Sequence, residues 1–301
     1  LRSTLIEGVQ QEITAIASGQ SQSISGWVQA KKAVIKSLGR SLQSAPVDQR
    51  TLMQSELSGE FDLTYFGDET GVMTMSDPTE NLPAGYDPRV RPWYQDAKQK
   101  SGPQITEPYV DATSGELIIT IAEAVKKSGK LRGVVGGDVS IDWIIRNILA
   151  VDLHGRGFVY LVDKDGLIIA HPDKNKVLES AESGLGYSSK QILSSEGKLV
   201  QIQGQQGASY LSSKQIPGTD WVIGFELTQA KVLAPLNNLL MYLAVAILIT
   251  SLVVSLAMAA ISNKLLSGIG RVSSMLAEMN KGQGDLRTRI PETSNDEVGD
   301  L

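Results

Sequence analysis

The sequence predicts an α/β membrane protein in which a long N-terminal helix precedes two tandem antiparallel-sheet modules, a transmembrane helix and a partial helical segment. Three observations support this prediction. Apolar residues recur at helical spacing over residues 1–44, strand-like alternation broken by turn residues occurs in two separate regions, and one long stretch carries no charge. The expected boundaries are 1–45 for the stalk helix, 46–153 and 154–235 for the membrane-distal and membrane-proximal modules, 239–261 for the transmembrane helix and 262–301 for the final segment.

The N-terminal helix is predicted by apolar residues spaced three and four apart in two runs. The runs extend from Ile6 to Ile16 and from Ile24 to Leu42. The segment between them, Ser18–Ser23, is polar, and we expect it to face solvent. Pro46 ends the helix, because proline lacks the amide hydrogen that a continuing helix needs.

In the first module the spacing of apolar residues changes from every third or fourth position, typical of a helix, to every second position, typical of a strand. Phe61–Phe66 and Gly71–Met75 flank a turn-rich tetrapeptide and predict a β-hairpin. The further elements expected are a short helix at Trp93–Gln99, a long antiparallel pair at 116–126 and 131–141, and a helix from Ile141 to Ala150 capped by Ser140.

The second module repeats this organisation. Phe158–Val162 and Leu167–Ala170 flank the turn Asp163–Gly166 and predict another hairpin. Three more strands are expected at 199–203, 208–215 and 221–227. Tyr65–Met75 and Tyr160–Ala170 therefore look like one structural unit used twice, about 95 residues apart.

The uncharged stretch is predicted to cross a membrane. Leu239–Ile261 is 23 residues long, and no charged residue occurs between Lys231 and Lys264. A helix of that length spans about 34 Å, enough for a hydrocarbon core of roughly 30 Å. A buried core helix is the alternative, but core helices of this length usually keep a polar face. Lys264, Arg271 and Lys281 follow the stretch and favour a cytoplasmic C-terminal side.

The final segment carries a heptad pattern. Its apolar positions are spaced four, three, four and three, which predicts a helix from Asn263 to Lys281 that packs in a coiled bundle and hence a homodimer; they are Leu265, Ile269, Val272, Leu276 and Met279. Gly282–Asp285 breaks the helix, and Asp296–Gly299 is expected to open a second one. We expect the chain to be a piece of a longer protein, with a membrane anchor before Leu1 and an output domain after Leu301.

Composition excludes several classes of function. The net charge of −5, with no basic stripe, argues against nucleic acid as a partner. There is no cysteine, so the chain has neither disulfides nor thiolate metal sites. His154 and His171 are isolated in the sequence, and Asp163–Gly166 lacks the later ligands of a calcium loop. We therefore expect no metal and no cofactor.

One cluster of residues has the chemistry of a ligand site. Arg91 can present a planar, two-pronged donor to a carboxylate, and Asp111 and Asp138 can accept hydrogen bonds from an ammonium group. Aromatic side chains with polar edges are common pocket walls; those in the cluster are Tyr86, Trp93 and Tyr109. The cluster predicts a sensor of a zwitterion rather than an enzyme.

Each of these residues also has a purely structural interpretation. Arg91 paired with Asp111 would be an ordinary ion pair, and the tyrosines would be half-buried strand residues. The end of the first hairpin supplies residues for which pocket lining and packing are equally good explanations; they are Tyr65, Met75, Ser76 and Asp77. The second module shows no comparable cluster in its sequence, and we expect it to be a spacer.

The sequence resembles two known modules. Residues 1–235 are similar to the double Cache sensor domain of bacterial chemoreceptors, and the pattern Tyr86, Arg91, Trp93, Tyr109, Asp111, Asp138 matches its amino-acid-binding subfamily in residue type and order. The segment after the membrane resembles a HAMP signal-relay module, through its heptads, its glycine-rich connector and Asp296-Glu297-x-Gly299. It departs from the HAMP pattern at Ile269, where a proline is often found.

The resemblance implies two PAS-like modules, of which the distal one binds an amino acid. By this analogy Tyr86, Arg91 and Trp93 hold the carboxylate, while Tyr109, Asp111 and Asp138 hold the α-ammonium group. It further implies a methyl-accepting chemotaxis receptor in the bacterial inner membrane. Its sensor would lie in the periplasm and its HAMP module in the cytoplasm, and an adaptor and a kinase would be the downstream partners.

Two alternatives stay open at this stage. The same sensor is compatible with a histidine kinase or a cyclic-dinucleotide enzyme as output domain. A hydrolase using Asp111 and Asp138 as acid and base is less consistent with the sequence, because Arg91 in the same cluster would hold both carboxylates ionised. The sequence offers no Gly-x-Ser-x-Gly, phosphate-loop or zinc motif for another reaction.

Overall fold

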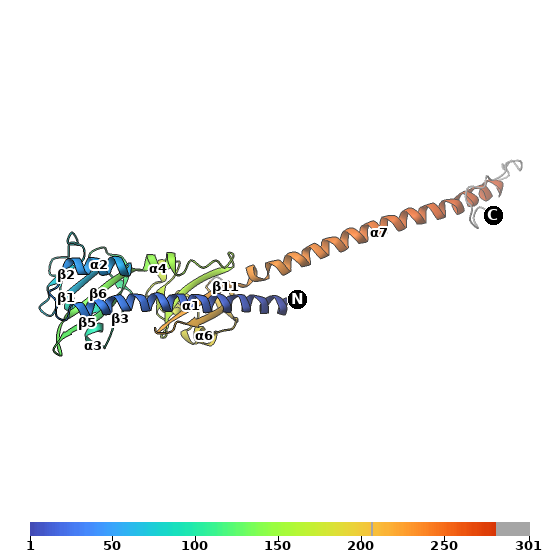
Figure 1. The fold of residues 1–301 in the computed structure, drawn as a ribbon. Coiled ribbons are helices and arrows are strands. Elements are labelled where there is room, and N and C mark those ends of the chain that lie inside the picture. Colours follow the sequence, from blue (N-terminus) through green and yellow to red (C-terminus); the bar gives the residue numbers. More distant parts are fainter. Residues whose placement is uncertain (206, 281–301) are drawn as a thin grey trace. The chain divides into compact units, whose positions relative to one another are not determined.

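The computed structural model describes residues 1–205 and 207–280. These divide into one compact unit over 1–234 and a second from Pro235 onward. The first unit contains the long helix α1 (Arg2–Ser41) and two separate antiparallel sheets (Figure 1). The α/β fold class expected from the sequence, a long helix followed by two antiparallel-sheet modules, is confirmed.

The first sheet has the strand order β2-β1-β6-β5-β3, with β4 also pairing with β5. Its long central pair, β5 and β6, is the pair expected from the sequence. The bounds are β1 Leu63–Asp68, β2 Met73–Met75, β3 Gln104–Ile105, β4 Tyr109–Val110, β5 Leu117–Lys127 and β6 Lys130–Ser140. The helices of this module are α2 (Gln49–Gly59), the 3-10 turn η1 (Pro88–Val90) and α3 (Pro92–Gln99). Helix α2 was not predicted, because Leu52 is its one fully buried apolar side chain and gives no periodic pattern.

The second sheet has the order β8-β7-β11-β10-β9. Its bounds are β7 Gly157–Asp163, β8 Ile168–Ala170, β9 Val200–Gly204, β10 Gly207–Gln215 and β11 Trp221–Thr228. Helix α4 (Ile141–Asn147) joins the modules and is capped by Ser140, whose Oγ accepts from the Trp143 amide at 3.1 Å. Short helices η2 (Lys174–Lys176), α5 (Ala181–Gly184) and α6 (Ser189–Ser194) lie between β8 and β9.

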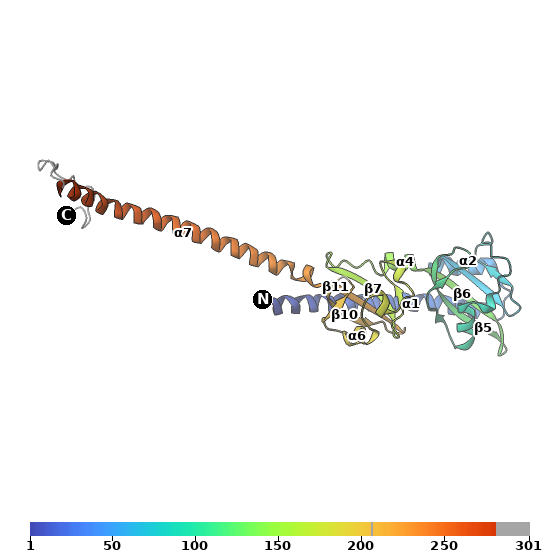
Figure 2. The same ribbon diagram turned by 180° about the vertical axis from the view of Figure 1, so that it is seen from behind.

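Helix α1 runs along both sheets, as both views show (Figure 1 and Figure 2). Its apolar positions at three-and-four spacing, such as Val9, Ile13 and Ile35, are buried in one core with residues from each sheet. The polar segment Ser18–Ser23 does not simply face solvent, contrary to expectation. Ser21 is buried, and its Oγ donates to the Gln215 carbonyl at 2.7 Å.

The alternation of side chains along each strand gives each sheet two different faces. Val135 and Val139 of β6 pack in the core that contains α1, whereas Val134 packs with Tyr65 and Trp93 on the opposite face. Asp138 shares the even-numbered face of β6 with Val134. The face of the first sheet away from α1 therefore carries the polar and aromatic residues of the predicted cluster.

Helix α7 (Gln229–Asn280) supplies the described part of the second unit from Pro235 onward. Among the described residues, 229–264 form one helix long and apolar enough to cross a membrane, with a mean hydropathy of 2.6 in its most apolar window. The helix continues without a break as far as Asn280, in agreement with the helix expected from the heptads. The glycine-rich connector and the Asp296–Gly299 motif lie outside the described residues.

Candidate ligand-binding site

All six residues of the predicted cluster line one pocket on the face of the first sheet away from α1. The complete lining is Leu63, Tyr65, Met73, Met75, Leu82, Tyr86, Arg91, Trp93, Tyr109, Asp111, Thr113 and Asp138. These residues come from β1, β2, β4, β6 and the segment around η1 and α3. Strand pairing and one tight turn thus bring together positions that are as many as 75 residues apart in the sequence.

The segment 86–93 is held by local hydrogen bonds and proline geometry. Asp87 caps η1 by accepting from the Arg89 amide at 2.9 Å, and it also pairs with the Arg89 guanidinium at 2.8 Å. Arg91 occupies the N-cap of α3, and Pro92 takes the first helical position, where its fixed φ is favourable. Arg91 and Trp93 consequently point to the sheet, while Arg89 is occupied with Asp87.

Asp138 forms the acidic end of the pocket. Its Oδ1 accepts from the Tyr65 hydroxyl and from Thr120 Oγ1, both at 2.6 Å, and the Tyr109 hydroxyl lies 2.5 Å from Thr120 Oγ1. Burial raises the pKa of Asp138 to about 7, although the hydrogen bonds from Thr120 and Tyr65 oppose this shift. The carboxyl group is therefore poised between its neutral and charged forms near neutral pH.

Arg91 forms the basic end. Its Nη2 donates to the Val110 carbonyl at 2.8 Å, and its guanidinium lies over the rings of Tyr86 and Tyr109, with centroids at 5.9 and 5.3 Å. Its Nε is buried without a hydrogen-bond acceptor. Buried donors are rarely left unsatisfied, so this edge of the guanidinium is suited to an incoming anion.

Asp111 is held by its own turn rather than by Arg91. Its Oδ2 accepts from the amides of Thr113 and Ser114 at 3.1 and 2.8 Å and from both their hydroxyls. These hydrogen bonds lower the pKa of Asp111 although its partial burial acts in the opposite direction. In the part of the chain that the structure describes, no ion pair joins Arg91 to Asp111, which removes the simplest structural explanation for Arg91.

The four hairpin residues divide into two pairs. Tyr65 and Met75 line the pocket, but Ser76 and Asp77 do not. Ser76 is buried and donates to Glu56, while its Oγ accepts from the Thr64 amide at 3.1 Å. Asp77 accepts from the Thr79 amide and hydroxyl at an exposed turn. Both therefore have structural roles.

Sequence reasoning missed Thr120, which connects Tyr109 to Asp138. Thr120 pairs directly with Asp138 across β5 and β6. It sits in a run of apolar strand residues, where a single threonine gives no functional signal. The strand register places it on the pocket face.

The pocket is closed in this structure. Its cavity volume is about 10 Å³, close to the minimum that a single water molecule needs. The side chains of the pocket must therefore move apart to admit a ligand.

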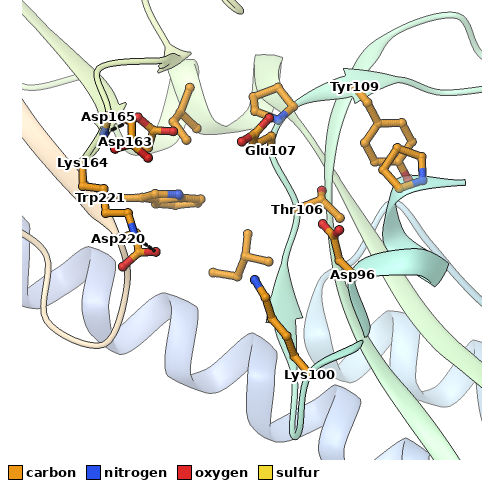
Figure 3. Close-up of a pocket in the computed structure, with 14 residues that line it drawn as sticks. Asp96, Lys100, Thr106, Glu107, Tyr109, Asp163, Lys164, Asp165, Asp220 and Trp221 are labelled. Atoms are coloured by element: carbon orange, nitrogen blue, oxygen red, sulfur yellow. Dashed lines mark hydrogen bonds and ion pairs between the residues drawn. The ribbon is translucent and has the colours of Figure 1, made fainter. Parts of the chain in front are cut away.

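A larger cavity of about 480 Å³ lies between the two sheets (Figure 3). Asp96, Lys100 and Glu107 line it from one module, and Asp163, Lys164 and Asp220 from the other. Most of these charged groups are exposed to solvent. Of the six predicted residues it contains only Tyr109, which also lines the smaller pocket.

Comparison with known proteins gives a family for this chain. Residues 1–236 match the model of the Cache domain. The chain is 31% identical to the methyl-accepting chemotaxis protein PctB of Pseudomonas aeruginosa and 29% identical to PscA of Pseudomonas syringae pv. tomato. Both matches cover all of this chain and 48% of the relative, so the chain spans about half the length of these relatives.

Solved structures give the same result. The ligand-binding domain of PctB in complex with L-Arg superimposes with a TM-score of 0.67 at 31% identity, covering 75% of this chain and 97% of that domain. The domain of the Pseudomonas fluorescens chemoreceptor CtaA in complex with L-alanine gives a TM-score of 0.65 at 32% identity, covering 74% and 98%. The chain therefore belongs to the Cache domain family, together with the ligand-binding domains of these amino acid chemoreceptors.

Proposed function

We propose that this chain is the sensing and membrane-spanning part of a bacterial chemoreceptor that binds L-amino acids, or close zwitterionic mimics, in its membrane-distal module. One observation carries the proposal: Arg91, Asp111 and Asp138 line the same pocket. The Nε atom of Arg91 is buried there without a hydrogen-bond acceptor. A ligand with a carboxylate and an ammonium group complements both ends.

The pocket residues divide between the two ends of the ligand. Arg91 takes the carboxylate through Nε, and Tyr86 and Trp93 wall this end. Asp111 and Asp138 accept from the ammonium group, and Tyr109 holds Asp138 in place through Thr120. An ammonium ion next to Asp138 favours the charged carboxylate, so binding at neutral pH completes the ionisation of this group.

Signalling requires that the ligand binds one conformation better than another. The pocket has a volume of about 10 Å³, so an amino acid would move apart the side chains of β1, β2 and the 86–93 segment that line it. We propose that this displacement is passed through the proximal module to α7, which crosses the inner membrane between the periplasmic sensor and a cytoplasmic HAMP module. The heptads of residues 263–281 would pair in a homodimer, and the output would act on an adaptor and a kinase.

The direct test removes the guanidinium. In Arg91→Ala, measured by isothermal calorimetry with L-alanine and L-arginine on the chain in detergent micelles, we expect affinity to fall at least about 100-fold, because a buried charge-assisted contact is lost. Thermal unfolding of the ligand-free variant should change little, since Arg91 donates to one backbone carbonyl.

The matched control is Arg89→Ala, two residues away. Arg89 is half exposed and pairs with Asp87 outside the pocket, so its removal should leave amino acid affinity within about twofold of the wild-type value. Equal affinities of the Arg91→Ala variant and the wild type would contradict the proposed function.

A further inference from the structure

The membrane-proximal module carries a cluster that its sequence alone did not reveal. We name it the proximal cluster; it consists of Phe158, Tyr160, His171, Tyr187 and Glu226. All five residues lie on the face of the second sheet away from α1, the same face that carries the pocket in the first sheet. The expectation that this module is a plain spacer is therefore not supported by its interior.

The proximal cluster occupies positions equivalent to those of the distal pocket. Tyr65 pairs with Gly136 across β1 and β6, and Tyr160 pairs with Gly224 across β7 and β11. In both modules a Cβ on that glycine would overlap the tyrosine ring, so the glycine lets the ring lie across the neighbouring strand.

The correspondence extends to the acidic residue. Asp138 follows Gly136 by two positions, and Glu226 follows Gly224 by two. Both carboxyl groups are buried, with exposed fractions of 5% and 4%, and each accepts from a tyrosine hydroxyl. For Glu226 the donor is Tyr187, whose hydroxyl lies 2.9 Å from Oε2. The structural unit that the sequence uses twice thus includes a buried carboxyl group in each module, Asp138 in the first and Glu226 in the second.

Two polar atoms of the cluster are buried without a well-formed hydrogen bond, the first of them beside Tyr187. They are the Tyr160 hydroxyl and His171 Nε2, in residues that are 0% and 4% exposed. His171 Nδ1 lies 2.9 Å from the Asp173 amide nitrogen and 3.2 Å from the Asp173 carbonyl oxygen, so the backbone already occupies this side of the ring. Burial lowers the pKa of His171 to about 4, so the ring is neutral at physiological pH. His171 Nε2 is consequently a buried ring nitrogen with hydrogen-bonding capacity left for a ligand.

Glu226 lacks a positive partner. In the described residues, no lysine, arginine or histidine forms an ion pair with it. Its surroundings are aromatic: the rings of Tyr160 and Tyr187 have centroids 6.4 Å apart, and those of Tyr160 and Phe158 are 6.2 Å apart. A buried carboxylate beside aromatic faces is the environment that stabilises a compact organic cation.

We propose that the proximal cluster is a second ligand site, for a small amine that carries a neighbouring oxygen acceptor. The ammonium group would pair with Glu226 against the faces of Tyr160 and Tyr187. The oxygen would accept from the Tyr160 hydroxyl, and as a hydroxyl it would also form a hydrogen bond with His171 Nε2. The cluster has no arginine, so this site does not require a carboxylate, unlike the distal pocket.

Ethanolamine is the probe, because it has an ammonium group and a hydroxyl but no carboxylate to pair with Arg91. Isothermal calorimetry on the chain in detergent micelles should show saturable binding in the wild type and the same affinity in Asp138→Asn, which removes the carboxylate that would receive an amine in the distal pocket. Glu226→Gln and Tyr160→Phe, which preserve size, should each weaken binding about tenfold or more. L-Alanine binding at the distal pocket should be unchanged in both variants, which also shows that they are folded.

Absence of saturable ethanolamine binding in the wild type would overturn the proposal. So would full affinity in Glu226→Gln, or loss of ethanolamine binding in Asp138→Asn, since the latter would place the amine in the distal pocket. These outcomes leave the distal amino acid site untouched, because L-alanine binding is measured separately on Glu226→Gln and Tyr160→Phe.

Discussion

At the scale of single residues, the chemistry of the distal pocket depends on Asp138. Thr120 and Tyr65 both donate to its Oδ1 and so favour the carboxylate, whereas complete burial favours the neutral acid. The balance brings the pKa to about 7, so the charge of this group in the ligand-free protein depends on small changes in its surroundings.

The pH dependence of amino acid affinity follows from this balance. The ammonium group binds the charged form of Asp138, so affinity should be constant above pH 7 and fall by up to about tenfold per pH unit below it. Calorimetry between pH 5.5 and 8.5 measures this profile.

Tyr65→Phe is a sharper version of the same experiment. It removes a hydrogen bond that lowers the pKa of Asp138, so the break in the affinity profile should move to higher pH. Asp138→Asn should bind weakly and show no break near pH 7. A profile identical in the wild type and both variants would mean that Asp138 does not meet the ammonium group.

At the scale of elements, glycine has opposite effects on β6 and on α1. A Cβ on Gly136 would lie 2.6 Å from the Tyr65 ring, whereas one on Gly26 of α1 would meet nothing within 4 Å. The first glycine makes room for a pocket wall, and the second only weakens an exposed stretch of helix.

Alanine substitutions at these two glycines should therefore change stability in opposite directions. Gly136→Ala should destabilise by about 1–3 kcal/mol through overpacking and reduce amino acid affinity, because Tyr65 must move. Gly26→Ala should stabilise by up to about 1 kcal/mol and leave affinity unchanged. Chemical unfolding and calorimetry on both variants check this; stabilisation by Gly136→Ala would refute the packing argument.

A buried lysine of helix α1 forms hydrogen bonds with the end of helix α2. Lys31 is 3% exposed, and its Nζ donates to the carbonyls of Gly59 and Glu60 at the C-terminal end of α2, each at 2.5 Å. The ring of Phe61 lies 4.5 Å from the same ammonium group. Burial lowers the pKa of Lys31 to about 8, although the nearby carboxylates of Glu60 and Asp62 oppose the shift.

Lys31→Met should destabilise the sensor by about 1–3 kcal/mol, because the two carbonyls at the end of α2 lose their donor. Lys36→Met on an exposed turn of the same helix should change stability by less than about 0.5 kcal/mol. Urea unfolding of the two variants provides the comparison, and equal effects would show that the contact with α2 contributes nothing.

At the scale of the whole molecule, the sensor and the membrane helix are separate units. The first has its own core around α1 and both sheets, and the second is dominated by the apolar part of α7. Ligand binding should therefore need only the first unit, and membrane attachment only the second.

Alkaline extraction of cell membranes should leave the chain in the pellet, because its apolar helix is long enough to span the hydrocarbon core. Residues 1–234 alone should be extracted into the supernatant and should bind L-alanine as tightly as the chain in micelles. Retention of residues 1–234 in the pellet would assign membrane attachment to the sensor instead.

The sequence by itself determined the order of the long helix, the two hairpins and the long strand pair, the apolar helix and the six residues of the distal pocket. These features depend on the periodicity of apolar residues, on charge and on the spacing of residues along the chain, all of which can be read from the sequence. The tertiary structure decided what lies next to what: Thr120 between Tyr109 and Asp138, Ser76 turned toward Glu56, and Glu226 beneath Tyr187. Strand register and the packing of distant segments create these contacts, and they have no signature in a chain read residue by residue.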